Sequence, residues 1–85
     1  MNMHTPPKAG EGMTAIQCLL ARTALGLTVR EAGEMTGTSH ATIVAIESDR
    51  PRIKFSTRVR VRAAFEEAGI TFNIDGINIR YRPRP

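Results

Sequence analysis

The chain has 85 residues, of which 41% are hydrophobic and 24% are charged. This length allows one domain with a modest core and no second one, and the composition argues against a wholly disordered chain. Twelve Lys and Arg residues against eight Asp and Glu residues give a net charge of +4, which favours a polyanionic partner such as nucleic acid.

Residues 1–12 contain two prolines, two glycines and no apolar periodicity, so we expect a mobile arm there. No apolar run approaches the ~20 residues that a membrane span needs. The N-terminus lacks the apolar segment of a signal peptide. Because the single cysteine, Cys18, rules out an internal disulfide, a reducing compartment also fits. We therefore expect a cytoplasmic protein without membrane contact.

A first helix is predicted from Thr14, because apolar residues recur at three- and four-residue spacing. The residues expected on its core side are Ile16, Leu19, Leu20, Thr23 and Ala24. Gly26 is placed to end this helix, since glycine enters the left-handed conformation readily. Cys18 lies within this apolar stretch, where a small buried thiol is the simpler interpretation than a nucleophile.

A second, short helix is predicted to begin at Thr28. Thr28 and Glu31 have the spacing of a capping box, in which each side chain satisfies a free amide at the start of the helix. Ala32 and Met35 are expected on the inner side of this helix. Gly37 follows as the turn residue, where a positive φ is expected.

A third helix is predicted from Ser39, a suitable N-cap residue, with Ile43 and Ile46 directed inward. It should end near residues 48–49, because the residue before Pro51 avoids the helical region. Gly33 stands four residues before the turn glycine, at the expected close approach of the two helices. Together these features predict a helix-turn-helix from about residue 28 to residue 47.

Residues 25–48, LGLTVREAGEMTGTSHATIVAIES, resemble the Cro/repressor-like (XRE) family of bacterial and phage regulators. The resemblance covers roughly residues 14–69. It implies a mainly α fold, a four-helix Cro/repressor-like helix-turn-helix domain, to which this chain adds a C-terminal β-hairpin. In that family the second helix of the pair enters the major groove with its N-terminal residues toward the base edges. The resemblance therefore implies base contacts by His40, Ala41, Val44 and Ala45.

The resemblance also implies an ion pair between Arg22 on the first helix and Glu47 at the end of the recognition helix. Such a pair would hold the two helices together. It would contribute to specificity rather than to net stability, because desolvation offsets much of the Coulomb attraction. The reading face departs from the family, because it offers few bidentate hydrogen bonds to bases. Readout by thymine methyl groups, by His40 and by DNA shape is the alternative. A second departure is Val29, where the family frequently has a polar residue.

The segment from Arg50 to Arg62 holds six basic residues and no acidic one. Its first part, Arg50 to Phe55, is expected to be a loop. Side chains near the recognition helix are expected to bind phosphate, which sets affinity but not sequence choice. The phosphate contacts that we expect are Arg30, Ser39, Thr42, Arg50, Arg52 and Lys54.

A fourth helix is predicted to start at Ser56 or Thr57 and to end at Gly69. Its inner side should carry Val61, Ala64, Phe65 and Ala68. Arg58 and Arg62 are four residues apart and share one face of this helix, whereas Arg60 projects elsewhere.

Asp75-Gly76 separates two alternating apolar runs, residues 70–74 and 77–81, and predicts a β-hairpin with a type I′ turn. A two-residue loop there pairs Ile74 with Ile77, Phe72 with Ile79 and Ile70 with Tyr81, all on one face. An isolated hairpin is marginally stable, so this face must cover something. Two interpretations remain open, namely packing on the helices of the same subunit and a dimer interface formed by these six residues.

The sequence shows no catalytic arrangement, metal-ligand spacing or nucleotide-binding motif, because His4, His40 and Cys18 form no cluster. We expect no enzymatic activity, no cofactor and no small-molecule effector. The expected organisation is an arm (1–12), a DNA-binding domain (13–69), a hairpin (70–82) and a frayed tail (83–85). The expected function is that of a dimeric, sequence-specific regulator, and its expected partners are double-stranded DNA and a second copy. The alternative is a protein-interaction module of the antitoxin or antiactivator type.

Overall fold

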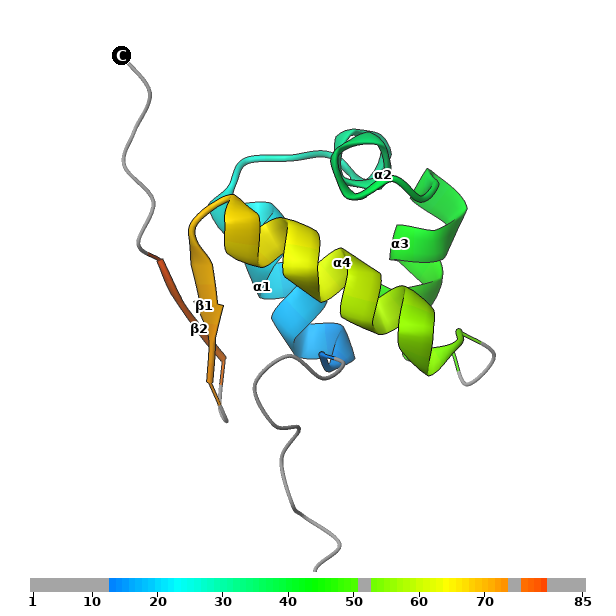
Figure 1. Cartoon of the computed structure of the whole chain (residues 1–85). Coiled ribbons are helices and arrows are strands. Elements are labelled where there is room, and N and C mark those ends of the chain that lie inside the picture. The colour runs from blue at the N-terminus through cyan, green and yellow to red at the C-terminus, as the bar shows by residue number, and fades with distance from the viewer. Residues whose placement is uncertain (1–12, 51–52, 74–75, 80–85) are drawn as a thin grey trace, which may run out of the picture.

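The computed structural model describes residues 13–50, 53–73 and 76–79, and its fold is mainly helical (Figure 1). The elements, in chain order, are α1 (Ala15–Ala24), α2 (Val29–Thr36), α3 (His40–Glu47), α4 (Phe55–Glu67), β1 (Ile70–Phe72) and β2 (Ile77–Ile79). The two strands form an antiparallel hairpin, which lies beside α1 and α4 on the side away from α3 (Figure 1). The predicted fold class is confirmed. The arm (1–12) and the tail (83–85) lie outside the described residues.

Each described helix and the first strand contribute to a single core. Its members are Met13, Cys18, Ala21, Ala32, Ile43, Ile46, Val61, Phe65, Ile70 and Phe72. The predicted inward positions of Ile43 and Ile46 on α3, and of Val61 and Phe65 on α4, are confirmed. Because α3 packs against α1 and α2, its inner side is covered and its outer side is left to solvent.

The prediction of which side of α1 faces the core is wrong. Ile16 is 59% exposed and Leu19 and Leu20 are each 39% exposed, whereas Cys18 and Ala21 are fully buried. Thr23 and Ala24 are exposed as well. The small residues face inward because they allow α1 to approach its neighbours closely, whereas the larger aliphatic residues lie on the opposite side.

Gln17 helps to fix this rotation of α1. Its side-chain Oε1 accepts a hydrogen bond from the backbone amide of Thr14, and its backbone amide donates to the Thr14 hydroxyl. These two hydrogen bonds complete a capping box. Its side-chain Nε2 also donates to the carbonyl oxygens of Asn73 and Gly76 in the hairpin. Gln17 can form hydrogen bonds with both Thr14 and the hairpin only when this side of α1 faces inward. These contacts therefore favour the observed orientation of the helix.

The predicted features of the α2–α3 pair are present. Thr28 and Glu31 form the capping box, with N–O distances of 2.9 and 3.0 Å. Gly37 ends α2 with a φ of 72°, and the Ser39 hydroxyl accepts from the Thr42 amide at the start of α3. A Cβ atom placed on Gly33 would lie 2.6 Å from the Ser39 carbonyl carbon, so the two helices meet at this glycine.

One predicted core contact of α2 is wrong, because Met35 is 38% exposed. Ala32 is buried, as predicted, and turning Gly33 toward Ser39 places Thr36 inward in place of Met35. The Thr36 hydroxyl is satisfied within the helix, since it donates to the Ala32 carbonyl at 2.8 Å.

The start of α4 lies at Phe55, one residue before the first of the two predicted positions. Lys54 is its N-cap and makes no side-chain capping hydrogen bond. Arg58 and Arg62 share a face of this helix, as predicted, and that face points into the protein. Arg58 donates to the Met13 carbonyl, whereas Arg62 is buried and pairs with Glu66 at 3.0 Å.

The predicted hairpin register is wrong by two residues. The observed partners are Ile70 with Ile79, Thr71 with Asn78, and Phe72 with Ile77. The Asn73 amide donates to the Gly76 carbonyl and the Gly76 amide donates to the Asn73 side chain, so these two residues close the turn. The Asn73 side chain accepts a hydrogen bond from the Gly76 amide, and this contact favours the observed register over a turn centred on Asp75-Gly76. Ile74 and Tyr81 lie outside the described residues.

Substitution of Gly33 tests the close approach of α2 and α3. Gly33→Ala forces the Ser39 backbone to move, and we expect the free energy of unfolding to fall by about 1–3 kcal/mol despite the better helix propensity of alanine. Urea denaturation measures this change. Gly37→Asn is the control, because asparagine tolerates the left-handed conformation and open space surrounds this position. Equal stability of Gly33→Ala and the original protein would contradict the close approach.

Candidate nucleic-acid interface

The outer side of α3 carries the residues that were predicted to contact bases. His40, Ala41 and Val44 are exposed and Ala45 is half-buried. These four side chains, together with Arg50, line an open hollow of about 340 Å³. Ala41, Val44 and Ala45 make part of its lining apolar, while His40 and Arg50 bring polar groups to it. The structure thus places the four predicted base contacts around one surface feature.

The described residues that were predicted to contact phosphate lie on α2, at the start of α3 and in the segment after α3. Ser39 and Thr42 lie at the start of α3, with their hydroxyl oxygens 3.1 Å apart. Arg30 is exposed on the first turn of α2, and Arg50 and Lys54 are exposed on the segment that follows α3. Arg52 lies outside the described residues.

Two of the six basic residues between Arg50 and Arg62 are taken up by contacts within the chain. Arg62 is 5% exposed and its guanidinium lies 4.9 Å from the centre of the Phe72 ring. Arg58 donates to the carbonyl of Arg50 as well as to that of Met13. The positive charge that α3 and its following segment offer to solvent is therefore smaller than the sequence indicates.

Asp49, which directly precedes Arg50 in the sequence, is an acidic residue that the sequence analysis did not single out. It is the one non-glycine residue with positive φ among the residues that the structure describes, at 56°. Its amide donates to Ile46 and the next amide, from Arg50, donates to Ala45, which ends α3. Its carboxylate is exposed and lies 3.8 Å from Arg58. The available signal for this position is an aspartate at a helix end, two residues before Pro51, because aspartate enters the left-handed conformation more readily than most residues.

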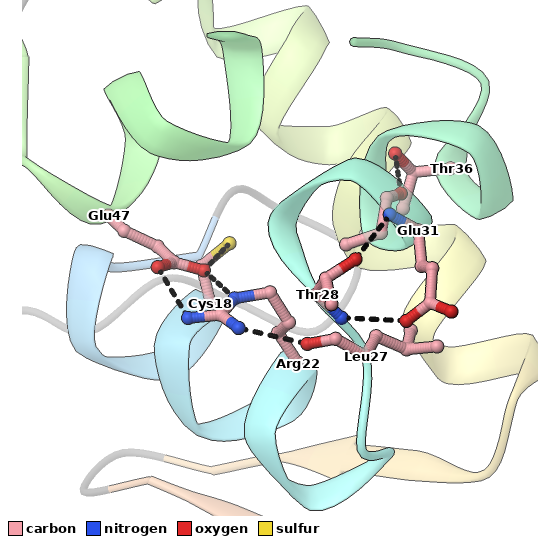
Figure 2. A network of polar contacts seen from close by, with 8 residues as sticks. Cys18, Arg22, Leu27, Thr28, Glu31, Thr36 and Glu47 are labelled. Carbon is pink, nitrogen blue, oxygen red and sulfur yellow. Dashed lines mark hydrogen bonds and ion pairs between the residues drawn. The ribbon is translucent and has the colours of Figure 1, made fainter. Parts of the chain in front are cut away.

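The predicted ion pair between Arg22 and Glu47 is present (Figure 2). Arg22 Nε lies 2.7 Å from Glu47 Oε2 and Arg22 Nη2 lies 3.1 Å from Glu47 Oε1. Arg22 Nη1 also donates to the Leu27 carbonyl at 2.9 Å. This fork connects the last turn of α1, the segment before α2 and the end of α3. The hydrogen bond to Glu47 raises the pKa of Arg22, so the guanidinium stays charged.

Cys18 completes this network beneath the ion pair. Its thiol lies 3.9 Å from Glu47 Oε2 and is fully buried (Figure 2). Burial, followed by the nearby Glu47 carboxylate, raises the pKa of the thiol from 9.0 to about 12. The thiolate required of a nucleophile is therefore absent near neutral pH.

The hairpin residues predicted for a dimer interface are only partly available to a second copy. Ile70 is fully buried and Phe72 nearly so, in the core of their own chain, so their assignment to an interface is wrong. Ile77 is half-buried and packs against the same core. The side chain of Ile79 lies outside the described residues, as do Ile74 and Tyr81. For the described part of the hairpin, packing on the helices of the same subunit is the interpretation that the structure supports.

Gln17 is the structural residue that the sequence analysis missed. Thr14 and Gln17 have the same spacing as Thr28 and Glu31, so the capping-box pattern was available to find it.

Comparison of the sequence with protein-family models found no match, and comparison with curated proteins found none either. Within the part of the chain that the structure describes, no three His, Cys, Asp or Glu side chains gather so as to hold a metal ion. None of the described helices is long and apolar enough to cross a membrane.

Removal of the Glu47 charge tests the ion pair. Glu47→Gln leaves the half-buried Arg22 without its charged partner, and we expect the free energy of unfolding to fall by about 2–3 kcal/mol. Urea denaturation checks this value. Glu34→Gln, on the exposed side of α2, removes the same charge and should change stability by about 0.5 kcal/mol or less. Similar effects of the two substitutions would argue against a structural role of the pair.

The burial of Cys18 predicts a loss of stability at high pH. Between pH 9 and 12 the unfolded chain releases the thiol proton while the folded chain keeps it, so the free energy of unfolding falls as the pH rises, by at most about 1.4 kcal/mol per pH unit. Cys18→Ala should lack this pH dependence. Urea denaturation of both proteins at several pH values from 8 to 11 measures the difference between their free energies of unfolding. The folded protein should also resist a thiol reagent at pH 8. Parallel pH profiles of the two proteins would contradict the prediction.

Proposed function

We propose that the chain is a sequence-specific regulator that binds double-stranded DNA and inserts α3 into the major groove. The observation that carries this proposal is the hollow on the outer side of α3, which gathers His40, Ala41, Val44, Ala45 and Arg50. A helix that projects beyond its neighbours can enter the groove, and its small side chains allow close approach to base edges. The resemblance of residues 25–48 to Cro/repressor-like regulators supports the same function.

The character of the hollow favours contacts with thymine. The side chains of Ala41, Val44 and Ala45 can contact the C5 methyl group, which distinguishes thymine in the major groove. His40 and Arg50 supply the hydrogen-bond donors of the same surface. Arg30, Ser39, Thr42 and Lys54 bind phosphates on either side, and these contacts position α3. We propose a non-catalytic role in the cytoplasm, in which two copies act as a repressor or autoregulator.

A protein-interaction module is the second candidate, because apolar side chains are exposed outside α3 too. Met35 is 38% exposed and Phe55 is 60% exposed. In this alternative, an antitoxin or antiactivator would bind its partner protein through these surfaces. The two functions are compatible in one protein, and the experiment below distinguishes them by the preference for DNA.

Selection of bound duplexes from a random pool, followed by fluorescence anisotropy at several salt concentrations, tests the proposal. We expect an enriched site bound with a Kd of about 10⁻⁸ M or tighter at physiological salt. The logarithm of the affinity should fall with the logarithm of salt concentration, with a slope of about −0.9 for each phosphate neutralised. Binding without preference over random duplex would reject sequence-specific regulation and leave the interaction module.

Substitutions on and beside α3 separate the two kinds of DNA contact. Lys54→Ala should weaken binding to all duplexes alike and make the salt slope shallower by about 0.9. Ala45→Leu fills the hollow and should change which bases are preferred, most strongly at thymines. Arg60→Ala is the matched control for charge, since Arg60 is exposed on α4. An unchanged base preference in Ala45→Leu would show that α3 does not read the bases.

A further inference from the structure

The outer side of α1 is an exposed apolar surface. Ile16, Leu19 and Leu20 are 59%, 39% and 39% exposed, and Thr23 is exposed beside them. Their spacing of three and four residues places them on one side of the helix, and we call these four residues the outer face of α1. The hairpin turn borders this face, since a Cβ atom on Gly76 would lie 3.5 Å from Leu20 Cδ1.

The outer face of α1 carries no charge. The only charged side chain of α1 is Arg22, which forms the inner fork with Glu47. In a two-fold interface each residue meets a copy of its own neighbourhood, so a charged surface repels itself and a neutral one does not. For a chain with a net charge of +4, this neutral apolar face is therefore suited to a second copy of the same chain.

The position of the outer face leaves α3 accessible. Cys18 contacts Glu47 of α3, which fixes the side of α1 that faces α3. Ile16 and Leu20 are each two residues from Cys18, a rotation of about 200° around the helix. A copy that docks on the outer face thus lies on the opposite side of α1 from α3.

We propose that a second copy of this chain docks on the outer face of α1, with the α1 helices of the two subunits packed against each other across a two-fold axis. This assembly presents two α3 helices. The role that we give to the dimer rests on the proposed DNA-binding function. The outer face of α1 replaces the hairpin as the interface, because Ile70 and Phe72 are buried in their own chain. A standard interface buries ~800 Å² per partner, more than a few aliphatic side chains supply, so we expect a dimer that dissociates in the micromolar range.

Sedimentation equilibrium of the full chain over a range of micromolar concentrations tests the proposal. Ile16→Glu and Leu19→Glu should each weaken dimerisation by about tenfold or more. The controls are Phe55→Glu and Met35→Glu, which place the same charge at positions with 60% and 38% exposure on α4 and α2. They should dimerise as the original protein does. All four variants should keep its circular dichroism spectrum and, at concentrations where the original protein is monomeric, its midpoint of thermal unfolding.

Three results would overturn the proposal. They are a monomer at every concentration, equal weakening by the controls, and a loss of folding stability confined to the α1 variants at concentrations where the original protein is monomeric, which would mean that another segment of the same chain covers this face. DNA binding is measured separately on the same proteins. Dimerisation without binding to any duplex would reject the proposed function and retain the interface, whereas specific binding by a constitutive monomer would do the reverse.

Discussion

The bidentate ion pair between Arg22 and Glu47 is the interaction on which the arrangement of the helices depends. The guanidinium of Arg22 on α1 contacts both the Leu27 carbonyl before α2 and Glu47 at the end of α3, which is 25 residues away in the sequence. The desolvation of both groups offsets much of the Coulomb attraction, so the pair contributes more to geometry than to net stability. The Cys18 thiol also contacts Glu47, so two residues of α1 hold the C-terminal end of α3.

The other end of α3 is held by a steric constraint. Gly33 brings the backbone of α2 against Ser39, and the hydroxyl of Ser39 caps α3 at the same point. Fixed at both ends, α3 has its isoleucines in the core and its small residues around the surface hollow. A rigid helix with a free outer side is what recognition of a DNA groove requires, because side chains must reach base edges without reorganisation of their support.

Much of the α2–α3 pair was predictable from the sequence because its determinants are local. A capping box at Thr28, a left-handed turn at Gly37 and an N-cap at Ser39 each depend on residues within four positions of one another. The Arg22–Glu47 pair is not local, and only the resemblance to a known family indicated it. The hairpin was predictable as an element, but its register was not, since Asn73 competed with Asp75-Gly76 for the turn.

The sequence by itself determined where the four helices and the hairpin lie and which residues form the helix-turn-helix, because backbone conformation follows from nearby side chains. Only the tertiary structure decided which side of α1 is buried. Both sides of that helix are apolar, and the choice rests on distant partners, namely Asn73 for Gln17 and Glu47 for Cys18 and Arg22. The same holds for Arg58 and Arg62, whose charges the fold withdraws from the surface by contacts with Met13 and with the Phe72 ring, which no spacing in the sequence reveals.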